Sequence, residues 1–279
     1  MFVDPPSEVA ATEFRSVMDE GHSKPILVGC HGFSGTANEI DWNDPSQYVV
    51  KLTRPHTGRD FRTRMACELI GAMLGKALGL NVPQYAVVHV SQGFVDSVPD
   101  DDAKQRLSRN VGMQFGTVYL ENVDTWRPSP SDKPQTVFEQ LTQILEYDST
   151  LLNGDRTSNR SNLLIQGSHC IPIDHEDTLR VYRMDDTEYE AFLDEPLMDD
   201  GDLRNHAVYE ELQPKEPAFG QVAKQWRDIP IREKLDSIRD HVPSHWESEE
   251  GDLERIFDFV HRRAEHLQAI IYQLHRVVR

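Results

Sequence analysis

Short runs of β-branched and apolar residues alternate with polar turns over the first fifty positions of the chain. Residues 12–18 (TEFRSVM), 25–30 (PILVGC) and 47–52 (QYVVKL) have the composition of β-strands. Gly21, between the first two runs, suits a tight connection. The pattern predicts an antiparallel meander whose third strand ends near Lys51.

A helical period comes next. Between residues 61 and 78, apolar side chains recur at every fourth position, which is the spacing of one helix face, and Gly79 is placed to end the helix. The chain then returns to a strand that ends near residue 90. Residues 96–106 (DSVPDDDAKQR) are predicted to be a charged loop, and residues 111–120 (VGMQFGTVYL) to be another strand.

The pattern changes from strands to helices near residues 121–124. Residues 134–152 have apolar positions at helical spacing, and a polar loop then leads to the short strands 162–165 (NLLI) and 170–174 (CIPID). Beyond them the chain is mostly helical in pattern up to residue 277, with an acidic surface stretch at 184–202. The prediction is an α+β chain with an antiparallel sheet and one helix in residues 1–122 and a mainly helical part in residues 123–279.

The charge of the chain restricts its partners. It has 29 Lys and Arg against 47 Asp and Glu, a formal net charge of -18. A surface this acidic repels nucleic-acid phosphates and anionic lipid headgroups, so we expect neither direct nucleic-acid binding nor membrane binding. Only a local basic pocket is compatible with an anionic ligand such as ATP.

The cysteines and the chain start indicate a reducing compartment. The three cysteines are widely spaced and form no metal-ligand pattern, and no run of about 18 apolar residues or basic leader occurs. The histidines match no zinc motif, so His206 and the others are taken as ordinary surface or core residues. We expect a soluble, cytoplasmic protein.

Four residues occur in the order that phosphoryl transfer requires. That reaction needs a cation on the phosphates, carboxylate and amide oxygens on Mg²⁺, and a carboxylate beside the attacking hydroxyl. Lys51 closes a predicted strand and Glu68 lies on the following helix, where the two are expected to pair, although Glu68 can also pair with Arg64 one turn away. Asp155 lies in a loop before a strand, and Asp174 ends the next strand.

Several blocks of the chain resemble the HipA-like kinase family. They are QYVVKL, CELIGAMLGKALGLNVPQYAVV, YDSTLLNGDRTSNRSNLL and IPIDHED, and the resemblance runs from about Thr12 to the C-terminal helices. It implies a two-lobed, protein-kinase-like fold that binds ATP and Mg²⁺. The strand lysine, helix glutamate, catalytic-loop aspartate and metal-binding aspartate of the family fall on Lys51, Glu68, Asp155 and Asp174.

The metal-binding amide departs from the kinase pattern. Five residues after the catalytic aspartate, where kinases have asparagine, this chain has Arg160. Asn159 and Asn162 are therefore both candidates. We favour Asn162 because it introduces the strand NLLI, where its side chain is held more rigidly than at a loop tip, and Mg²⁺ tolerates little ligand movement.

The loop that covers the phosphates also departs from the kinase pattern, because no G-x-G-x-x-G occurs near the N-terminus. The resemblance aligns EGHSKP with that loop, so backbone N–H groups of Gly21, His22 and Ser23 are expected to contact phosphate. It further implies that Ser23 is an inhibitory autophosphorylation site, with an unmodified loop serine as the alternative. Glu121, at the junction of the two lobes, completes the expected nucleotide-binding set.

Two neighbours of the expected site residues have open roles. Arg156 is expected to neutralise Asp155 or to contact a phosphate, with a surface ion pair as the alternative. His175 follows Asp174 at the position of phenylalanine in protein kinases, and it is expected to pack or to orient the loop without transferring a proton.

The identity of the phosphoryl acceptor is implied by the resemblance alone. It points to a Ser or Thr hydroxyl of a protein, in a toxin-like bacterial system with an antitoxin-like partner. A small-molecule or lipid hydroxyl would use the same residues. The alternative from another class is a catalytically idle nucleotide-binding or scaffolding module, suggested by the irregular asparagine position but opposed by the presence of both aspartates.

Overall fold

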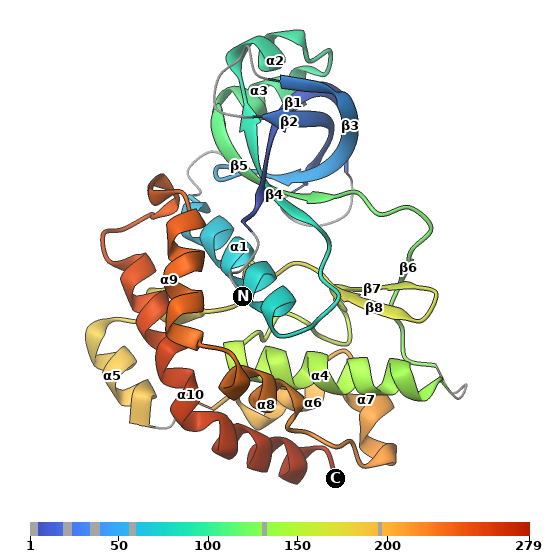
Figure 1. The fold of residues 1–279 in the computed structure, drawn as a ribbon, viewed down its shortest axis with the longest axis vertical. Coiled ribbons are helices and arrows are strands. Elements are labelled where there is room, and N and C mark those ends of the chain that lie inside the picture. Colours follow the sequence, from blue (N-terminus) through green and yellow to red (C-terminus); the bar gives the residue numbers. More distant parts are fainter. Residues whose placement is uncertain (1–4, 19–23, 34–39, 56–59, 130–132, 195–196) are drawn as a thin grey trace.

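A β-barrel forms the N-terminal part of the chain. The computed structural model describes residues 5–18, 24–33, 40–55, 60–129, 133–194 and 197–279. Its first five strands close in the order β1-β2-β3-β5-β4 (Figure 1). They are β1 (Ser7–Val17), β2 (Ile26–Phe33), β3 (Ile40–Lys51), β4 (Tyr85–Val90) and β5 (Gly112–Val118).

The closure of this barrel corrects the prediction of an antiparallel sheet. Four of its strand pairs are antiparallel, but β1 pairs with β4 in parallel, with Ser7 opposite Ala86. Irregular register in β1 and β2, between Ala11 and Glu13 and between Cys30 and Gly32, increases local twist and bends these strands. Periodicity along single strands contains no information about such a long-range pairing.

The barrel has its own apolar core. Inward-facing side chains of its strands are joined there by residues of two short helices. These are α2 (Gln92–Ser97) and α3 (Asp101–Ser108). The end of α2 and most of α3 occupy residues 96–106, the segment that was predicted to be a charged loop. The Asp100 carboxylate accepts from the Ala103 N–H at 2.7 Å, and two further aspartates lie in the first turn of α3. Capping therefore makes a helix of a segment whose composition suggested a loop.

Helix α1 (Arg62–Ala77) lies between the barrel and the helical part (Figure 1). It is buried along most of its length, as its apolar period predicted, and it belongs to the larger core rather than to the barrel core. Gly79 follows it with φ +80°, the left-handed conformation that ends helices.

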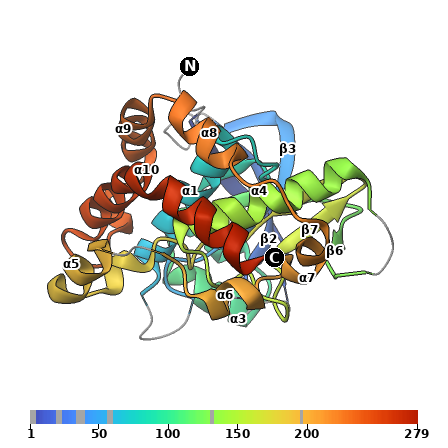
Figure 2. The same cartoon turned by 90° about the horizontal axis from the view of Figure 1, so that it is seen from below.

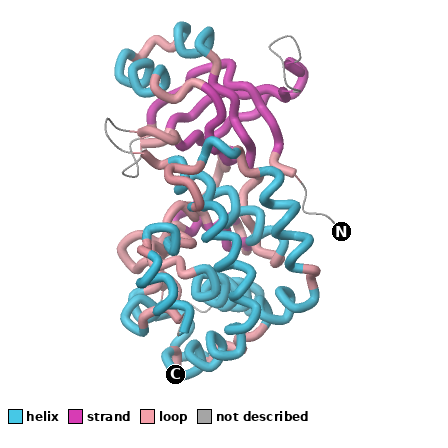
Figure 3. The backbone as a smooth tube through the Cα atoms, turned by 90° about the vertical axis from the view of Figure 1, so that its left-hand side faces the viewer, coloured by secondary structure: helices cyan, strands magenta, loops and turns pink. Residues whose placement is uncertain are grey.

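A small three-stranded sheet lies below the barrel. It has the order β6-β7-β8, formed by β6 (Asp124–Thr125), β7 (Leu163–Gln166) and β8 (His169–Pro172). Figure 3 shows these strands between the barrel and the helices. The hairpin of β7 and β8 was predicted, whereas β6 is too short to show a period.

Helices make up the rest of the C-terminal part. Helix α4 (Gln135–Leu151) and the long α10 (Asp252–Val277) run close together, as seen from below in Figure 2. The buried Arg263 of α10 donates to the carbonyls of Thr150 and Ser149 at 2.6 and 3.1 Å, at the last turn of α4. The acidic stretch contains α5 (Asp186–Asp194), and its Tyr189 is buried.

The remaining helical elements follow in chain order. They are η1 (Arg180–Arg183), α6 (Asp200–Asn205), α7 (Tyr209–Leu212), η2 (Gln213–Lys215), α8 (Gln221–Asp228), α9 (Ile231–His241) and η3 (Ser244–Trp246). Among the described residues, none of the helices combines the length and the apolar character needed to span a bilayer.

Candidate active site

A cavity of about 520 Å³ opens between the barrel and the β7-β8 hairpin. Its apolar side includes Val49 of the barrel and Leu164 of β7, and its polar side includes Lys51, Asn162 and Asp174. A cavity with an apolar wall and a few convergent polar groups is the usual form of a small-molecule site.

Lys51 lies at the end of β3 and is surrounded by carboxylates. Its Nζ is 2.7 Å from Asp174 Oδ1, 3.2 Å from Glu68 Oε2 and 3.5 Å from Glu176 Oε2. Burial alone would lower the pKa of Lys51, but these carboxylates outweigh burial and raise it. Lys51 is therefore a fixed cation. The structure thus brings together Lys51, Glu68 and Asp174, three residues that are far apart in sequence.

Glu68 is held on α1 with its carboxylate almost fully buried. Burial raises its pKa to about 8, against the opposing effect of Lys51. Arg64, the alternative partner considered for it, instead reaches Glu176 at 3.3 Å and Asp177 at 3.5 Å.

Sequence reasoning missed Glu176. One carboxylate oxygen from each of Glu68, Asp174 and Glu176 lies within 4.8 Å of the other two. Glu176 takes the place of the glycine in the D-F-G signature of protein kinases. The available signal was the run of acidic residues in IDHED, which placed a second carboxylate two residues after Asp174.

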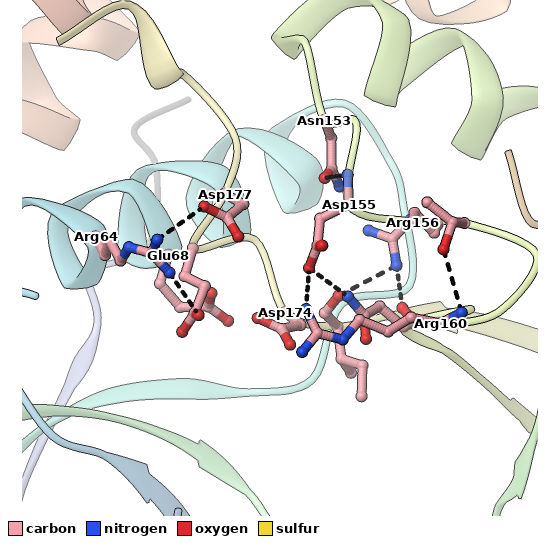
Figure 4. A network of polar contacts seen from close by, with 12 residues as sticks. Arg64, Glu68, Asn153, Asp155, Arg156, Arg160, Asp174 and Asp177 are labelled. Atoms are coloured by element: carbon pink, nitrogen blue, oxygen red, sulfur yellow. Dashed lines mark hydrogen bonds and ion pairs between the residues drawn. The ribbon is translucent and has the colours of Figure 1, made fainter. Parts of the chain in front are cut away.

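Asp155 lies in the loop that follows α4. The helix ends because Leu152 adopts a left-handed conformation with φ 59°, and Asn153 Oδ1 then accepts from the Asp155 N–H at 3.2 Å. Asp155 Oδ2 accepts from Arg160 Nη1 at 2.8 Å and from Asn162 Nδ2 at 3.3 Å (Figure 4). Both donors bind the same carboxylate oxygen.

Asn162 and Asp174 both lie at the open end of the hairpin. The Ile173 N–H donates to the Asn162 carbonyl at 3.0 Å, and both Asn162 and Asp174 line the cavity. Their φ angles are 42° and 61°, a left-handed backbone that asparagine and aspartate tolerate better than most residues. Asn159, the other candidate, is exposed in the preceding loop.

Arg156 does not neutralise Asp155, so that expectation is wrong. Its side chain is fully buried, and its Nε donates to Asp148 Oδ2 at 2.6 Å. Its Nη1 donates to the carbonyls of Asn162 and Ile173. The two carbonyls belong to one expected metal ligand and to the residue before the other, so Arg156 fixes their separation.

Asp148 is the centre of this buried network and was not singled out from the sequence. It also accepts from Asn153 Nδ2 at 2.8 Å and is bonded to His206 Nε2 at 2.9 Å. Burial would raise its pKa, but Arg156 and His206 outweigh burial and hold the pKa far below its ordinary value. His206 is therefore a partner of the loop, a role that its sequence context did not reveal.

His175 packs beneath the segment that carries Asp174. It is buried, and its ring lies edge-on to Tyr147 with 5.9 Å between centroids. Burial and then Arg156 lower its pKa to about 3, so the ring is neutral. A Cβ on Gly71 of α1 would lie 2.7 Å from His175 Cβ, so only glycine permits this approach.

Of the other residues expected to contact the nucleotide, the structure describes only Glu121. Gly21, His22 and Ser23 lie outside the described residues. Glu121 is exposed, and its carbonyl accepts from Gln166 Nε2 at 3.0 Å. Its neighbour Leu120 lines the cavity.

The donor set suits Mg²⁺. Asp174 offers a carboxylate and Asn162 an amide oxygen to one cavity, and Mg²⁺ prefers oxygen ligands from one or two protein groups together with substrate phosphates. Such a metal would neutralise phosphate charge in this cavity.

The model of the HipA-like kinase family matches residues 40–273. The chain belongs to this family. A solved structure of the Helicobacter pylori proinflammatory kinase CtkA is similar with a TM-score of 0.53 and 14% sequence identity, over 95% of each chain, which supports the kinase-like fold. No curated protein matches the sequence. Family and fold together support a kinase.

Proposed function

We propose that this protein is an ATP-dependent kinase that transfers the γ-phosphoryl group to a Ser or Thr hydroxyl of a protein. The observation that carries the proposal is the arrangement of Lys51, Asn162 and Asp174 around one cavity, with Asp155 bonded to Asn162. These groups provide a cation, oxygen ligands and a base, which is what phosphoryl transfer requires.

Each end of the cavity suits one part of the nucleotide. Val49, Phe115 and Leu164 offer an apolar surface for the base, beside Tyr119 and Leu120 at the junction of barrel and helices. The phosphates would lie at Lys51, which Glu68 holds in place. We further propose that residues 1–122 and 123–279 act as two lobes around the nucleotide, with Gly21, His22, Ser23 and Glu121 completing its contacts.

Asp155 is the proposed base. Among the described residues its Oδ2 is occupied by Arg160 and Asn162, while its Oδ1 accepts no hydrogen bond. The proton of the attacking hydroxyl would move to Oδ1 as the acceptor oxygen bonds to the γ-phosphorus. The bond from that phosphorus to the bridging oxygen breaks, and ADP leaves with the electron pair. A positioned base of this kind contributes about 10²- to 10⁴-fold in rate.

The setting proposed from the resemblance is a cytoplasmic, toxin-like system with an antitoxin-like partner. The three cysteines are free and buried, which suits a reducing compartment. The acidic surface favours neutral or basic protein acceptors over nucleic acid.

Transfer from γ-labelled ATP tests the proposal. Purified protein is incubated with Mg²⁺, labelled ATP and cell lysate, and the labelled species are identified. We expect labelled protein with the parental chain and a loss of at least about 10²-fold with Asp155→Asn. Asp236→Asn, an exposed change on α9, is the matched control and should keep parental activity.

Three outcomes contradict the proposal in different ways. Parental activity in Asp155→Asn removes the base assignment. Label in a lipid or small molecule removes the protein acceptor. Nucleotide binding without any transfer by the parental chain indicates the idle, scaffolding class instead.

A further inference from the structure

We infer that the Arg160 guanidinium is a second catalytic cation, which contacts the transferring phosphoryl group while it holds Asp155. The inference rests on the proposed function and concerns the same site. It gives a role to the residue that replaces the usual metal-binding asparagine five positions after the catalytic aspartate.

The backbone around Arg160 is fixed by a tight turn. The Arg160 N–H donates to the Thr157 carbonyl at 3.1 Å and to Thr157 Oγ1 at 3.2 Å. The Thr157 N–H in turn donates to the Arg160 carbonyl at 2.9 Å. The side chain therefore starts from a defined position and reaches Asp155 Oδ2 at 2.8 Å.

The charges around Arg160 place it between the base and the metal-binding aspartate. Burial is the largest single effect and lowers the pKa of Arg160, but Asp155, Asp174 and Glu176 together outweigh burial and raise it. Figure 4 shows the Arg160 side chain extending beside Asp155 and Asp174. A phosphoryl group passing from a nucleotide near Asp174 to a hydroxyl at Asp155 would pass next to this guanidinium.

Lys51 does not supply the positive charge beside the transferring phosphoryl group. Its ammonium is held by three carboxylates and its side chain is 13% exposed, whereas the Arg160 side chain is 36% exposed. A guanidinium has five N–H donors in a rigid fork, so one edge can hold Asp155 while another binds a phosphate oxygen. Arg160 is thus an accessible cation beside the proposed base.

The transfer step explains why a cation is needed there. As the bond from the γ-phosphorus to ADP breaks and the bond to the acceptor oxygen forms, negative charge is spread over three equatorial oxygens. The acceptor proton goes to Asp155 Oδ1, so no charge is removed from the phosphoryl oxygens themselves. An arginine that contacts them in this state is worth about 10³- to 10⁵-fold in kcat in other phosphoryl-transfer enzymes.

The first test compares Arg160→Gln and Arg160→Lys with the parental chain in Mg²⁺-dependent turnover of γ-labelled ATP. We expect kcat to fall about 10²- to 10³-fold in the Gln variant and less in the Lys variant, because part of the charge remains. Binding of Mg-ADP, measured by calorimetry, should change less than about threefold, because ADP lacks the γ-phosphoryl group. Arg227→Gln on α8 is the control and should keep parental kcat.

The second test separates contact with the phosphoryl group from an effect on Asp155 alone. In Arg160→Ala, added guanidinium ion should restore part of the activity, and the loss should persist at every pH from 6 to 9. Recovery of parental activity in Arg160→Gln at alkaline pH would show that no contact with the phosphoryl group has been lost, and it would overturn the inference. Parental kcat in Arg160→Gln, with Asp155→Asn inactive, would overturn it while leaving the proposed function intact. Parental activity in Asp155→Asn would remove the proposed function itself.

Discussion

Arg156 Nε donates to Asp148 Oδ2 at 2.6 Å, and both side chains are completely buried. This ion pair supports the loop that carries Asp155, since Arg156 also binds the carbonyls of Asn162 and Ile173. A buried pair is costly to break, because removing one partner leaves an unpaired charge in a medium of low polarity.

Replacing Asp148 by Asn should therefore destabilise the protein by about 3 to 5 kcal/mol at pH 7. The folded-state pKa of Asp148 is depressed, so its contribution is complete above the ordinary aspartate value of about 4 and is lost as pH falls below it. The parental chain should thus lose stability more steeply below pH 4 than Asp148→Asn. Denaturant unfolding at several pH values measures how the unfolding free energy of each chain changes with pH. Equal pH dependence in the parental chain and in Asp148→Asn would contradict the depressed pKa of Asp148.

Glu68 gives a pH dependence of opposite sign. Its pKa is raised to about 8 by burial, so the folded chain binds more protons than the unfolded chain from about pH 5 to pH 8. Its contribution is present below that window and is lost as pH rises through it. Relative to the parental chain, Glu68→Gln should gain about 1 kcal/mol per pH unit across this window. If the difference in unfolding free energy between Glu68→Gln and the parental chain did not change between pH 5 and pH 8, Glu68 would be fully ionised in the folded chain.

The two candidate asparagines differ in their expected effect on magnesium. Asn162 lines the cavity with Asp174, whereas Asn159 is exposed. Asn162→Ala should raise the Mg²⁺ concentration for half-maximal activity at least about tenfold, by analogy with the loss of other metal-ligand contacts. Asn159→Ala is the matched control and should leave that concentration unchanged. The opposite result would assign the metal to Asn159.

Gly71 provides a test of the packing beneath Asp174. A methyl group there would lie 2.7 Å from His175 Cβ, so Gly71→Ala should displace the segment that carries Asp174. Overpacking of this kind costs about 1 to 3 kcal/mol of unfolding free energy. Activity should fall even under conditions in which the variant remains folded, because Asp174 is displaced. Gly75→Ala on the same helix is the milder control, because its nearest neighbours would be Val82 Cγ1 at 3.0 Å and the Tyr147 hydroxyl at 3.5 Å. Equal effects of the two changes on activity would argue against the displacement.

Local patterns predicted the helices and strands that have a clear period. The apolar spacing of 61–78 corresponds to α1, and NLLI and CIPID correspond to β7 and β8. Residues 96–106 were misread because capping by Asp100, a short-range hydrogen bond, decided their conformation. Barrel closure depends on a pairing between distant strands, which no local period contains.

The candidate site shows the same limit. Lys51, Glu68, Asp155, Asn162 and Asp174 were chosen by residue type and by their order. The structure places four of them on the wall of the cavity, and Asp155 is hydrogen-bonded to one of these four, Asn162. Asp148 and Glu176 were missed because their roles arise from side-chain packing rather than from a motif. Arg156 was linked to its sequence neighbour Asp155, although its buried partner Asp148 lies eight residues earlier, in the last turn of α4.

The parallel pairing of β1 with β4 has a consequence for synthesis on the ribosome. One edge of β1 pairs with β2, but its other edge pairs with β4 and stays open until residues 85–90 have been made. The barrel closes only when β5 follows and pairs with both β4 and β3. At about 5 to 20 residues per second, the nascent chain carries an open strand edge for several seconds. Pairing partners so distant in sequence also slow folding. The start of the chain is thus the part most exposed to mispairing while the protein is being made.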